Sequence, residues 1–305
     1  MVMTVRQHRH DRAVARDGTV LPNQLWVDWY ESIHLGIPND FILAISASGK
    51  SSMSGTGKTT CGVTHAKFFD TSAMPDGLRQ EQKVDAIMDG TASGFDGEKK
   101  ATLSLGDFAR DIPNIEDQSA IIYDEAQGIG DETGLDSRRS MKTETLQGIN
   151  NILANRDKSL TVIIIAQHLP SLDKRLPGLL DGWLLIRKGA DEPDGPVAKY
   201  HNMYMNDYDF GSPKVKTPIV DTITWQSLPH DDDDYAALEA KKQEAKQIAR
   251  EDSEDRDLPK PVQAELAYNI KESRDVPWRD VPKHSDRLTY SGDYLRRIAK
   301  DELDL

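Results

Sequence analysis

Several features common in secreted and membrane proteins are scarce in this chain of 305 residues. Its one cysteine, Cys61, excludes an internal disulfide. No apolar run approaches the length of a membrane span, and the polar, basic stretch 1–16 lacks the apolar segment of a signal peptide. We therefore expect a cytoplasmic protein without a membrane span.

Positive charge is also in short supply. The 38 Lys and Arg residues against 51 Asp and Glu residues give a net charge of −13, which is not typical of general nucleic-acid binders. Proteins of salt-loving hosts are often acidic as well, so the charge argues only weakly against a DNA partner. Any contact with DNA has to come from local basic patches.

The most informative segment is 52–60, Ser-Met-Ser-Gly-Thr-Gly-Lys-Thr-Thr. It follows the apolar run 41–45 and precedes 61–69, which can form a helix. A strand, a loop of small residues and a helix after Gly-Lys-Thr are the layout of a P-loop, where backbone N–H groups and the helix N-terminus bind phosphate. The predicted nucleotide-binding residues are Ser54, Gly55, Thr56, Gly57, Lys58, Thr59 and Thr60.

Two residues of this loop have specific expected roles. Lys58 would reach the β- and γ-phosphates of ATP, and the Thr59 hydroxyl would ligate Mg²⁺. The usual pattern G-x-x-x-x-G-K-[ST] has a glycine where this chain has Ser52, which puts the phosphate geometry in question. A second Gly-Lys-Ser, at 49–51, offers a competing register. We favour the downstream register because it is richer in glycine and hydroxyl groups and leads into the helical segment.

A second motif lies at 119–127, where an apolar strand ends in two adjacent carboxylates, Asp124 and Glu125. In P-loop ATPases such a strand lies beside the first one. Its aspartate holds the Mg²⁺ shell, and the glutamate after it polarises the attacking water as a general base. The alternative is a buried strand with a polar turn at its end.

The rest of the chain alternates strands with helices, which predicts an α/β fold with a mostly parallel sheet flanked by helices. The run 160–166 is apolar on both faces, as a central parallel strand should be. A short strand and turn are expected at 101–108, and further strands at 182–187, 197–205 and 219–225, the last two antiparallel. Helices are expected at 25–35, 78–88, 140–156 and 234–250. The expected division is a polar tail (1–23), a P-loop core (24–230), an acidic helix with a charged linker (231–260) and a small helical unit (261–305).

The order of P-loop, Asp-Glu strand, helix with arginine, and apolar strand ending in Gln167 resembles the HerA–FtsK superfamily of ring-forming P-loop ATPases. The resemblance covers about 41–187. Segments 136–141, 155–156 and 166–176 are similar to ATPases of archaeal viruses, plasmids and integrated elements. Relatives include viral genome-packaging ATPases and zonula-occludens-toxin-like proteins. The resemblance implies a RecA-like core, ATP and Mg²⁺ as ligands, and a ring, for which we expect a hexamer.

The resemblance also implies roles for two polar residues. Gln167 would be the sensor that contacts the γ-phosphate or the attacking water, whereas the alternative is that it caps the strand. Arg156 would act in trans as a finger on a neighbouring subunit's ATP, with Arg138 and Arg139 as alternatives. Surface salt bridges are the competing explanation for each arginine.

The function implied is a motor that moves double-stranded DNA, for genome packaging or for transfer of a plasmid or mobile element. A portal, capsid or transfer complex would be its partner, in the host cytoplasm or on the virion. Lys83, Lys99 and Lys100 are candidates for loops that grip DNA. The alternatives are an assembly ATPase without translocation and, less favoured, a nucleotide or small-molecule kinase, because arginines do not cluster after the P-loop.

The C-terminal unit is similar to helix-turn-helix units, through Trp-Arg-Asp-Val at 278–281 and the helical stretch 288–300. In that arrangement Arg296, Arg297 and Lys300 would face phosphates. The alternative is a capping or partner-docking helical tail.

Overall fold

The computed structural model describes residues 13–35, 39–48, 56–125, 156–172, 176–187, 196–205, 215–225, 228–229, 231–256, 260–285, 288 and 290–302. The chain divides into two compact units, Met1–Lys242 and Gln243–Leu305. The division falls within helix α7 (Asp233–Arg256). Within the described ranges, no helix combines bilayer-spanning length with sufficient apolar character.

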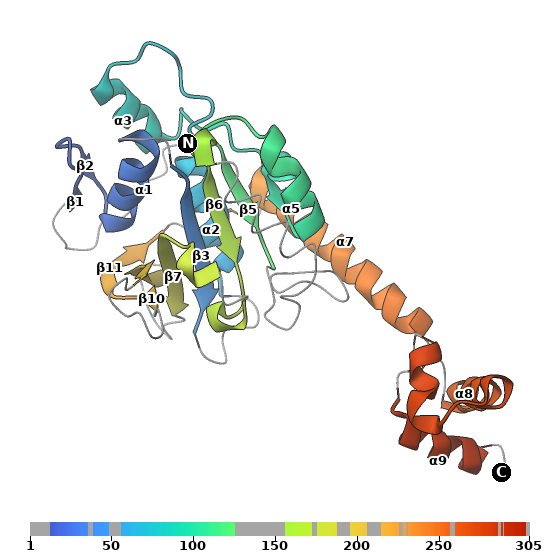
Figure 1. The fold of residues 1–305 in the computed structure, drawn as a ribbon. Helices are drawn as coiled ribbons and strands as arrows, with labels where there is room; N and C mark the ends of the chain where they lie inside the picture. The colour runs from blue at the N-terminus through green and yellow to red at the C-terminus, as the bar shows by residue number, and fades with distance from the viewer. Residues whose placement is uncertain are drawn as a thin grey trace. The chain divides into compact units, whose positions relative to one another are not determined.

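A seven-stranded sheet forms the centre of the first unit (Figure 1), in the order β11-β8-β7-β3-β6-β5-β4. The five strands from β7 to β4 are parallel, and β8 and β11 extend one edge antiparallel. When only these five parallel strands are counted, from β3 as the first to β7 as the fifth, their order across the sheet is 5-1-4-3-2. The mostly parallel α/β fold predicted from the sequence is confirmed, and the arrangement is consistent with a RecA-like core. The strands are β3 (Phe41–Ala47), β4 (Ala101–Thr102), β5 (Ala120–Tyr123), β6 (Thr161–Ile165), β7 (Gly182–Arg187), β8 (Val197–Asn202) and β11 (Ile219–Thr224).

The position of β6 corrects one expectation. The strand that precedes Asp124, β5, does not lie beside β3, because β6 pairs with both of them and separates them. All five residues of β6 are buried. A strand with parallel neighbours on both sides and cover on both faces needs apolar residues on both faces. β6 meets this need at every position except Thr161, whose hydroxyl accepts from Trp29 Nε1.

Helices and short turns connect these strands (Figure 1). The α-helices are α1 (Gln24–His34), α2 (Lys58–Phe69), α3 (Gln80–Asp89), α4 (Gly97–Lys100) and α5 (Leu105–Asp111). The 3₁₀ turns are η2 (Ile112–Asn114), η4 (Arg156–Lys158), η5 (Leu169–Ser171) and η6 (Leu176–Gly178). Two small antiparallel pairs join β1 (Ala13–Val14) to β2 (Val20–Leu21) and β9 (Tyr204–Met205) to β10 (Val215–Lys216).

One face of the sheet is covered by α1 and α2. Gly62 of α2 lies so close to β6 that an added Cβ would come within 2.6 Å of Ile165 Cδ1. Trp29 of α1 stacks on Phe69 of α2 at 4.4 Å, and its Nε1 donates to Thr161 Oγ1 at 2.9 Å. These contacts fix the start of β6 and the end of α2 together.

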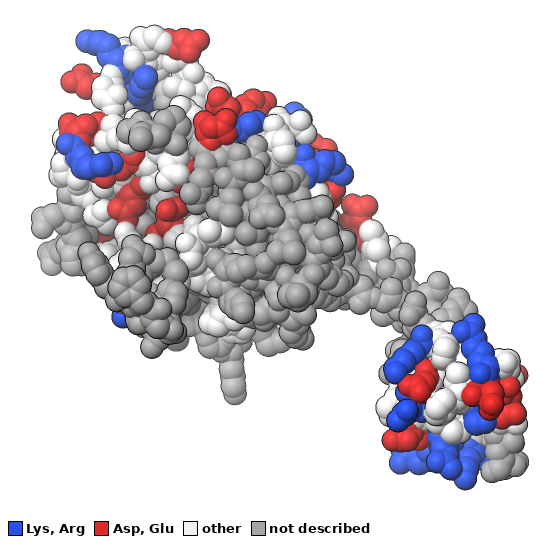
Figure 2. Space-filling view, viewed as in Figure 1, with Lys and Arg blue, Asp and Glu red and all other residues white. Residues whose placement is uncertain are grey.

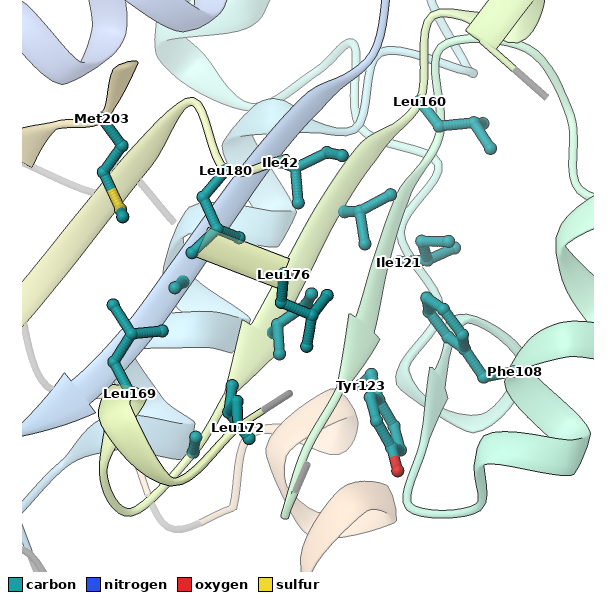
Figure 3. Close-up of a cluster of buried hydrophobic side chains, with 14 of the residues drawn as sticks. Ile42, Phe108, Ile121, Tyr123, Leu160, Leu169, Leu172, Leu176, Leu180 and Met203 are labelled. Atoms are coloured by element: carbon teal, nitrogen blue, oxygen red, sulfur yellow. The ribbon is translucent and has the colours of Figure 1, made fainter. Parts of the chain in front are cut away.

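The other face carries a separate apolar cluster (Figure 3). Alternate residues of the same strands point into it, because successive side chains of a strand face opposite sides. Leucines from η5, η6 and the residues next to them cover the strands, and Phe108 of α5 stacks on Tyr123 at 5.2 Å. The labelled members in Figure 3 are Ile42, Phe108, Ile121, Tyr123, Leu160, Leu169, Leu172, Leu176, Leu180 and Met203.

Two other expectations differ from the structure, and a third falls outside the described residues. In the segment 101–108 the short strand is β4, with two residues, but helix α5 begins at Leu105 where a turn was expected. The charged linker expected after residue 250 is helical as far as Arg256 in α7. The helix expected at 140–156 lies outside the described residues except for Arg156, which opens η4.

The C-terminal unit packs α8 (Lys260–Arg274), η7 (Trp278–His284) and α9 (Gly292–Glu302) around its own small core. Ala267, Val281 and Leu295 are fully buried there. The expected second helix is 3₁₀, and it contains Pro282. Lys and Arg side chains are interspersed with Asp and Glu over this unit (Figure 2). A helix-turn-helix function stays a prediction.

Candidate nucleotide and metal site

Apart from Arg156, the predicted site residues that the structure describes collect at one edge of the sheet. Strand β3 leads toward the P-loop, Asp124 and Glu125 directly follow β5, and Gln167 follows β6. Because β3, β6 and β5 are parallel neighbours, their carboxyl ends meet at the same edge. Ligands of open parallel α/β sheets bind at this edge.

The end of the P-loop is defined by the start of α2. The helix begins at Lys58, and Gly57 before it has φ of 78°, a conformation that side chains on an L-residue disfavour. The Thr60 hydroxyl donates to the Gly57 carbonyl at 2.8 Å and so holds this turn. The helix start at Lys58 agrees with the downstream register. Ser54, Gly55, Ser52 and the competing 49–51 segment lie outside the described residues.

Thr59 and Asp124, the two predicted metal ligands, are in direct contact. The Thr59 hydroxyl donates to Asp124 Oδ2 at 2.9 Å. A third side chain, Lys242 of α7, places its ammonium 2.7 Å from the same Oδ2 and also donates to Thr59 Oγ1. Asp124 is 2% exposed and Lys242 about as well buried, at 7%. A cation therefore contacts both the hydroxyl and the carboxylate.

The first half of α7 is held against the sheet unit by several contacts. Lys67 of α2 forms ion pairs with Asp232 at 2.6 Å and Asp234 at 2.8 Å. The Gly97 amide donates to Asp234 Oδ1 at 2.7 Å, and Lys241 donates to the Ala101 carbonyl at 2.7 Å. These contacts fix the position of the part of α7 that belongs to the first unit, and with it the position of Lys242.

Sequence reasoning did not find Lys242. It lies in a helix rich in Ala, Glu, Lys and Gln, where any one of several lysines would have been an equal candidate. The one local signal is the acidic run 231–234 at the start of the helix, whose partner Lys67 is adjacent only in the folded chain.

The two lysines of the site are affected differently by their surroundings. Burial lowers the pKa of Lys58, although the charges of Glu125 and Asp124 act in the opposite direction. Burial also opposes the charge of Lys242, but attraction to Asp124 and a hydrogen bond with it raise the pKa above its ordinary value. Lys242 is thus a stable cation in this position.

The donor atoms present fit Mg²⁺. A hydroxyl and a carboxylate are hard oxygen ligands, and Mg²⁺ is usually held by one or two protein groups, with water and phosphate oxygens completing its shell. The arrangement already binds one cation, the Lys242 ammonium. Among the described residues, no group of three or more His, Cys, Asp or Glu side chains could hold a metal. A metal at Thr59 and Asp124 would therefore depend on phosphate and water for its other ligands.

Glu125 occupies an unusual backbone conformation. Its φ is 51°, in the left-handed region that non-glycine residues rarely adopt, and its amide donates to Asp124 Oδ1 at 2.7 Å. Such conformations cost on the order of 1–3 kcal/mol and cluster at functional sites. The chain thus turns sharply after β5, and Asp124 is held from both sides.

The remaining predicted residues differ in how the structure places them. Gln167 is half-buried after β6, between the strands that carry the P-loop and Asp124. Arg156 lies before β6, at the opposite edge of the sheet, and five strand residues span about 17 Å. This position does not serve the same subunit's site, and a role in trans stays a prediction. The side chain of Arg156, and Arg138 and Arg139 altogether, lie outside the described part.

The prediction that Lys100 contacts DNA is wrong. Lys100 is 8% exposed and forms an ion pair with the fully buried Asp70 at 2.8 Å, so its ammonium cannot grip a DNA backbone. Lys83 and Lys99 are exposed.

Comparison with known proteins gives little beyond the structure itself. No family model and no curated protein matches the chain. Among solved structures, the chain is similar to the N-terminal domain of zonular occludens toxin from Neisseria meningitidis, with 17% identity and a TM-score of 0.30, over 60% of this chain and 95% of that one. A match at that TM-score has no bearing on function.

Proposed function

We propose that this chain is a P-loop ATPase that binds ATP with Mg²⁺ and hydrolyses it. The observation that supports the proposal best is the direct contact between Thr59, one residue after the helix start at Lys58, and Asp124 at the end of β5. Two motifs that predict the same metal from separate parts of the sequence converge on one point.

The proposed roles follow from the chemistry of each side chain. Lys58 and the N-terminus of α2 attract the phosphates. Thr59 and Asp124 hold the metal, which when bound neutralises phosphate charge. Glu125 accepts a proton from the attacking water, and Gln167, whose amide can both donate and accept, orients that water or the γ-phosphate.

Calorimetry of the purified full chain with ATP and Mg²⁺ tests binding, and phosphate release tests hydrolysis. Lys58→Ala should abolish measurable binding, whereas Lys83→Ala, at an exposed lysine of α3, should not. Glu125→Gln should retain ATP but lower hydrolysis by 100-fold or more, in line with the loss of a general base. Absence of any heat of binding, also in concentrated potassium chloride, would overturn the proposal.

We further propose that hydrolysis drives movement of double-stranded DNA by a ring of subunits, as the resemblance to the HerA–FtsK superfamily implies. A ring, for which we expect a hexamer, would let Arg156 of one subunit reach a neighbour's ATP. Two measurements test this: subunit number by native mass spectrometry, and phosphate release with and without duplex DNA. Stimulation by duplex DNA that is lost in Arg156→Ala would support a motor. A well-formed ring whose hydrolysis ignores DNA would favour an assembly ATPase instead.

A further inference from the structure

We propose that Lys242 is a built-in cation that holds the metal position, so that a Mg²⁺–nucleotide complex binds only after the Lys242 ammonium has left. This inference rests on the proposed function, because it concerns the same site. A residue of α7, outside both the P-loop and the Asp-Glu motif, would then regulate metal binding at that site.

The hydrogen bonds around Thr59 show why the two cations exclude each other. A hydroxyl has one proton and two lone pairs. The Thr59 proton is donated to Asp124 Oδ2, and the hydroxyl oxygen accepts from Lys242. A metal ligated by Thr59 needs that oxygen at about 2.1 Å, where it would lie next to the ammonium. Two positive charges this close in a buried site repel strongly.

The contacts of Asp124 point the same way. Its Oδ2 accepts from Thr59 at 2.9 Å and faces the ammonium at 2.7 Å, while its Oδ1 accepts from the Glu125 amide at 2.7 Å. A carboxylate that is 2% exposed needs a compensating charge when no metal is bound. Lys242 supplies that charge, and so it stabilises the nucleotide-free protein.

The structure also offers Lys242 a second partner once it leaves. Glu239 lies three residues earlier on α7, with Oε1 3.2 Å from the ammonium, and its side chain is 33% exposed. A lysine that swings toward Glu239 keeps an ion pair and gains contact with water. Exchange of the two cations therefore does not require a charge to remain unpaired.

The test compares Lys242→Met with Lys246→Met. Both remove an ammonium from α7 and keep the apolar stem, but Lys246 is exposed and lies one turn further on. Melting temperatures are measured in EDTA and with Mg²⁺ alone, and dissociation constants for a fluorescent ATP analogue are measured with Mg²⁺. Lys242→Met should melt lower than wild type in EDTA, gain more from Mg²⁺ alone, and bind the Mg²⁺–nucleotide about tenfold tighter. Lys246→Met should match wild type.

Three results for Lys242→Met would overturn the proposal. The first is that neither the melting temperature nor the dissociation constant differs from wild type, and the second is that Mg²⁺ alone raises the melting temperature less than in wild type. The third is weaker nucleotide binding, which would make Lys242 a nucleotide-binding residue. If neither protein binds nucleotide, the proposed ATPase function fails, while the melting shift with Mg²⁺ alone still decides the role of Lys242. If Lys242→Met does not fold, Lys242→Gln, which can still donate to Asp124 without a charge, replaces it with the same expectations.

Discussion

The Thr59 hydroxyl donates to Oδ2 of Asp124 at 2.9 Å and thereby joins the first turn of α2 to the end of β5. Neither residue needs the other for its local structure, since α2 begins at the Gly57 turn and β5 is fixed by pairing with β6. Their contact is a consequence of the sheet order. A substitution at Thr59 should therefore change the hydrogen bonding of Asp124.

Removal of the Thr59 hydroxyl should affect both stability and the metal. In Thr59→Val, Asp124 loses one hydrogen bond in a buried position, which costs about 1–2 kcal/mol of unfolding free energy. Mg²⁺ should then no longer strengthen nucleotide binding. Thr59→Ser keeps the hydroxyl and is the matched control. Urea unfolding and nucleotide titration with and without Mg²⁺ measure the two effects, and equal Mg²⁺ dependence in both variants would contradict the assignment.

The sequence predicted most of the fold because its strands are distinctive. β6 is buried throughout and apolar at every position except Thr161, and β7 (Gly182–Arg187) has the bounds that were expected. The order of the strands could not be predicted, because nothing in β5 or β6 alone says which of them pairs with β3. Short elements such as β4, with two residues, carry too little periodicity to be distinguished from the turn that follows.

The site was predictable only where a motif carries the chemistry. Lys58, Thr59 and Asp124 stand in patterns whose spacing predicts phosphate and metal binding. Lys242 and the pairing of Lys100 with Asp70 depend on contacts between residues far apart in the chain. A lysine in a polar helix has the same sequence signature whether it faces solvent or a buried carboxylate, so the fold alone distinguishes the two.

The ion pair of Lys100 and Asp70 predicts that loss of the Lys100 charge lowers the unfolding free energy far more than loss of the neighbouring Lys99 charge. Asp70 is fully buried and accepts from the Gly94 and Ala120 amides as well as from Lys100. Lys100→Met leaves that carboxylate without a compensating charge and should cost about 3–5 kcal/mol of unfolding free energy. Lys99→Met is the control, because the Lys99 side chain is 81% exposed, and it should cost less than about 1 kcal/mol. Equal costs in urea unfolding would show that the pair contributes little.

The buried His65 predicts loss of stability in mild acid. Burial lowers its pKa from 6.5 to about 4, and its Nδ1 donates to the Cys61 carbonyl at 2.8 Å. Between these pKa values the unfolded chain binds a proton that the folded chain does not, so stability is full above pH 6.5 and falls as the pH drops toward 4. From pH 7 to pH 5 this group should remove about 2 kcal/mol.

Urea unfolding at the two pH values measures this effect, with His65→Gln for comparison. The variant should lose less stability than wild type over the same interval, by about 2 kcal/mol. His34, whose pKa is lowered to about 4 by burial and by Lys83, keeps its own contribution in both proteins. An identical pH dependence of the two proteins would mean that His65 is protonated in the folded state.

Gly292 predicts a change confined to the C-terminal unit. An added Cβ would lie 2.0 Å from the Trp278 carbonyl oxygen and 2.7 Å from Arg279 Cα, both backbone atoms that cannot move aside cheaply. Gly292→Ala should therefore force α9 away from η7, at a cost of about 3 kcal/mol or more. Hydrogen exchange should show loss of protection in α8 and α9 while the amides of β3 and β6 keep theirs, because the sheet has its own core. Lys300→Ala, at an exposed position of α9, should leave both regions unchanged.

Nucleotide binding should survive in Gly292→Ala, since every residue assigned to the site belongs to the first unit. If Gly292→Ala loses both nucleotide binding and the hydrogen-exchange protection of α8 and α9, the site depends on the second unit. The assignment of the site to the first unit alone would then be wrong.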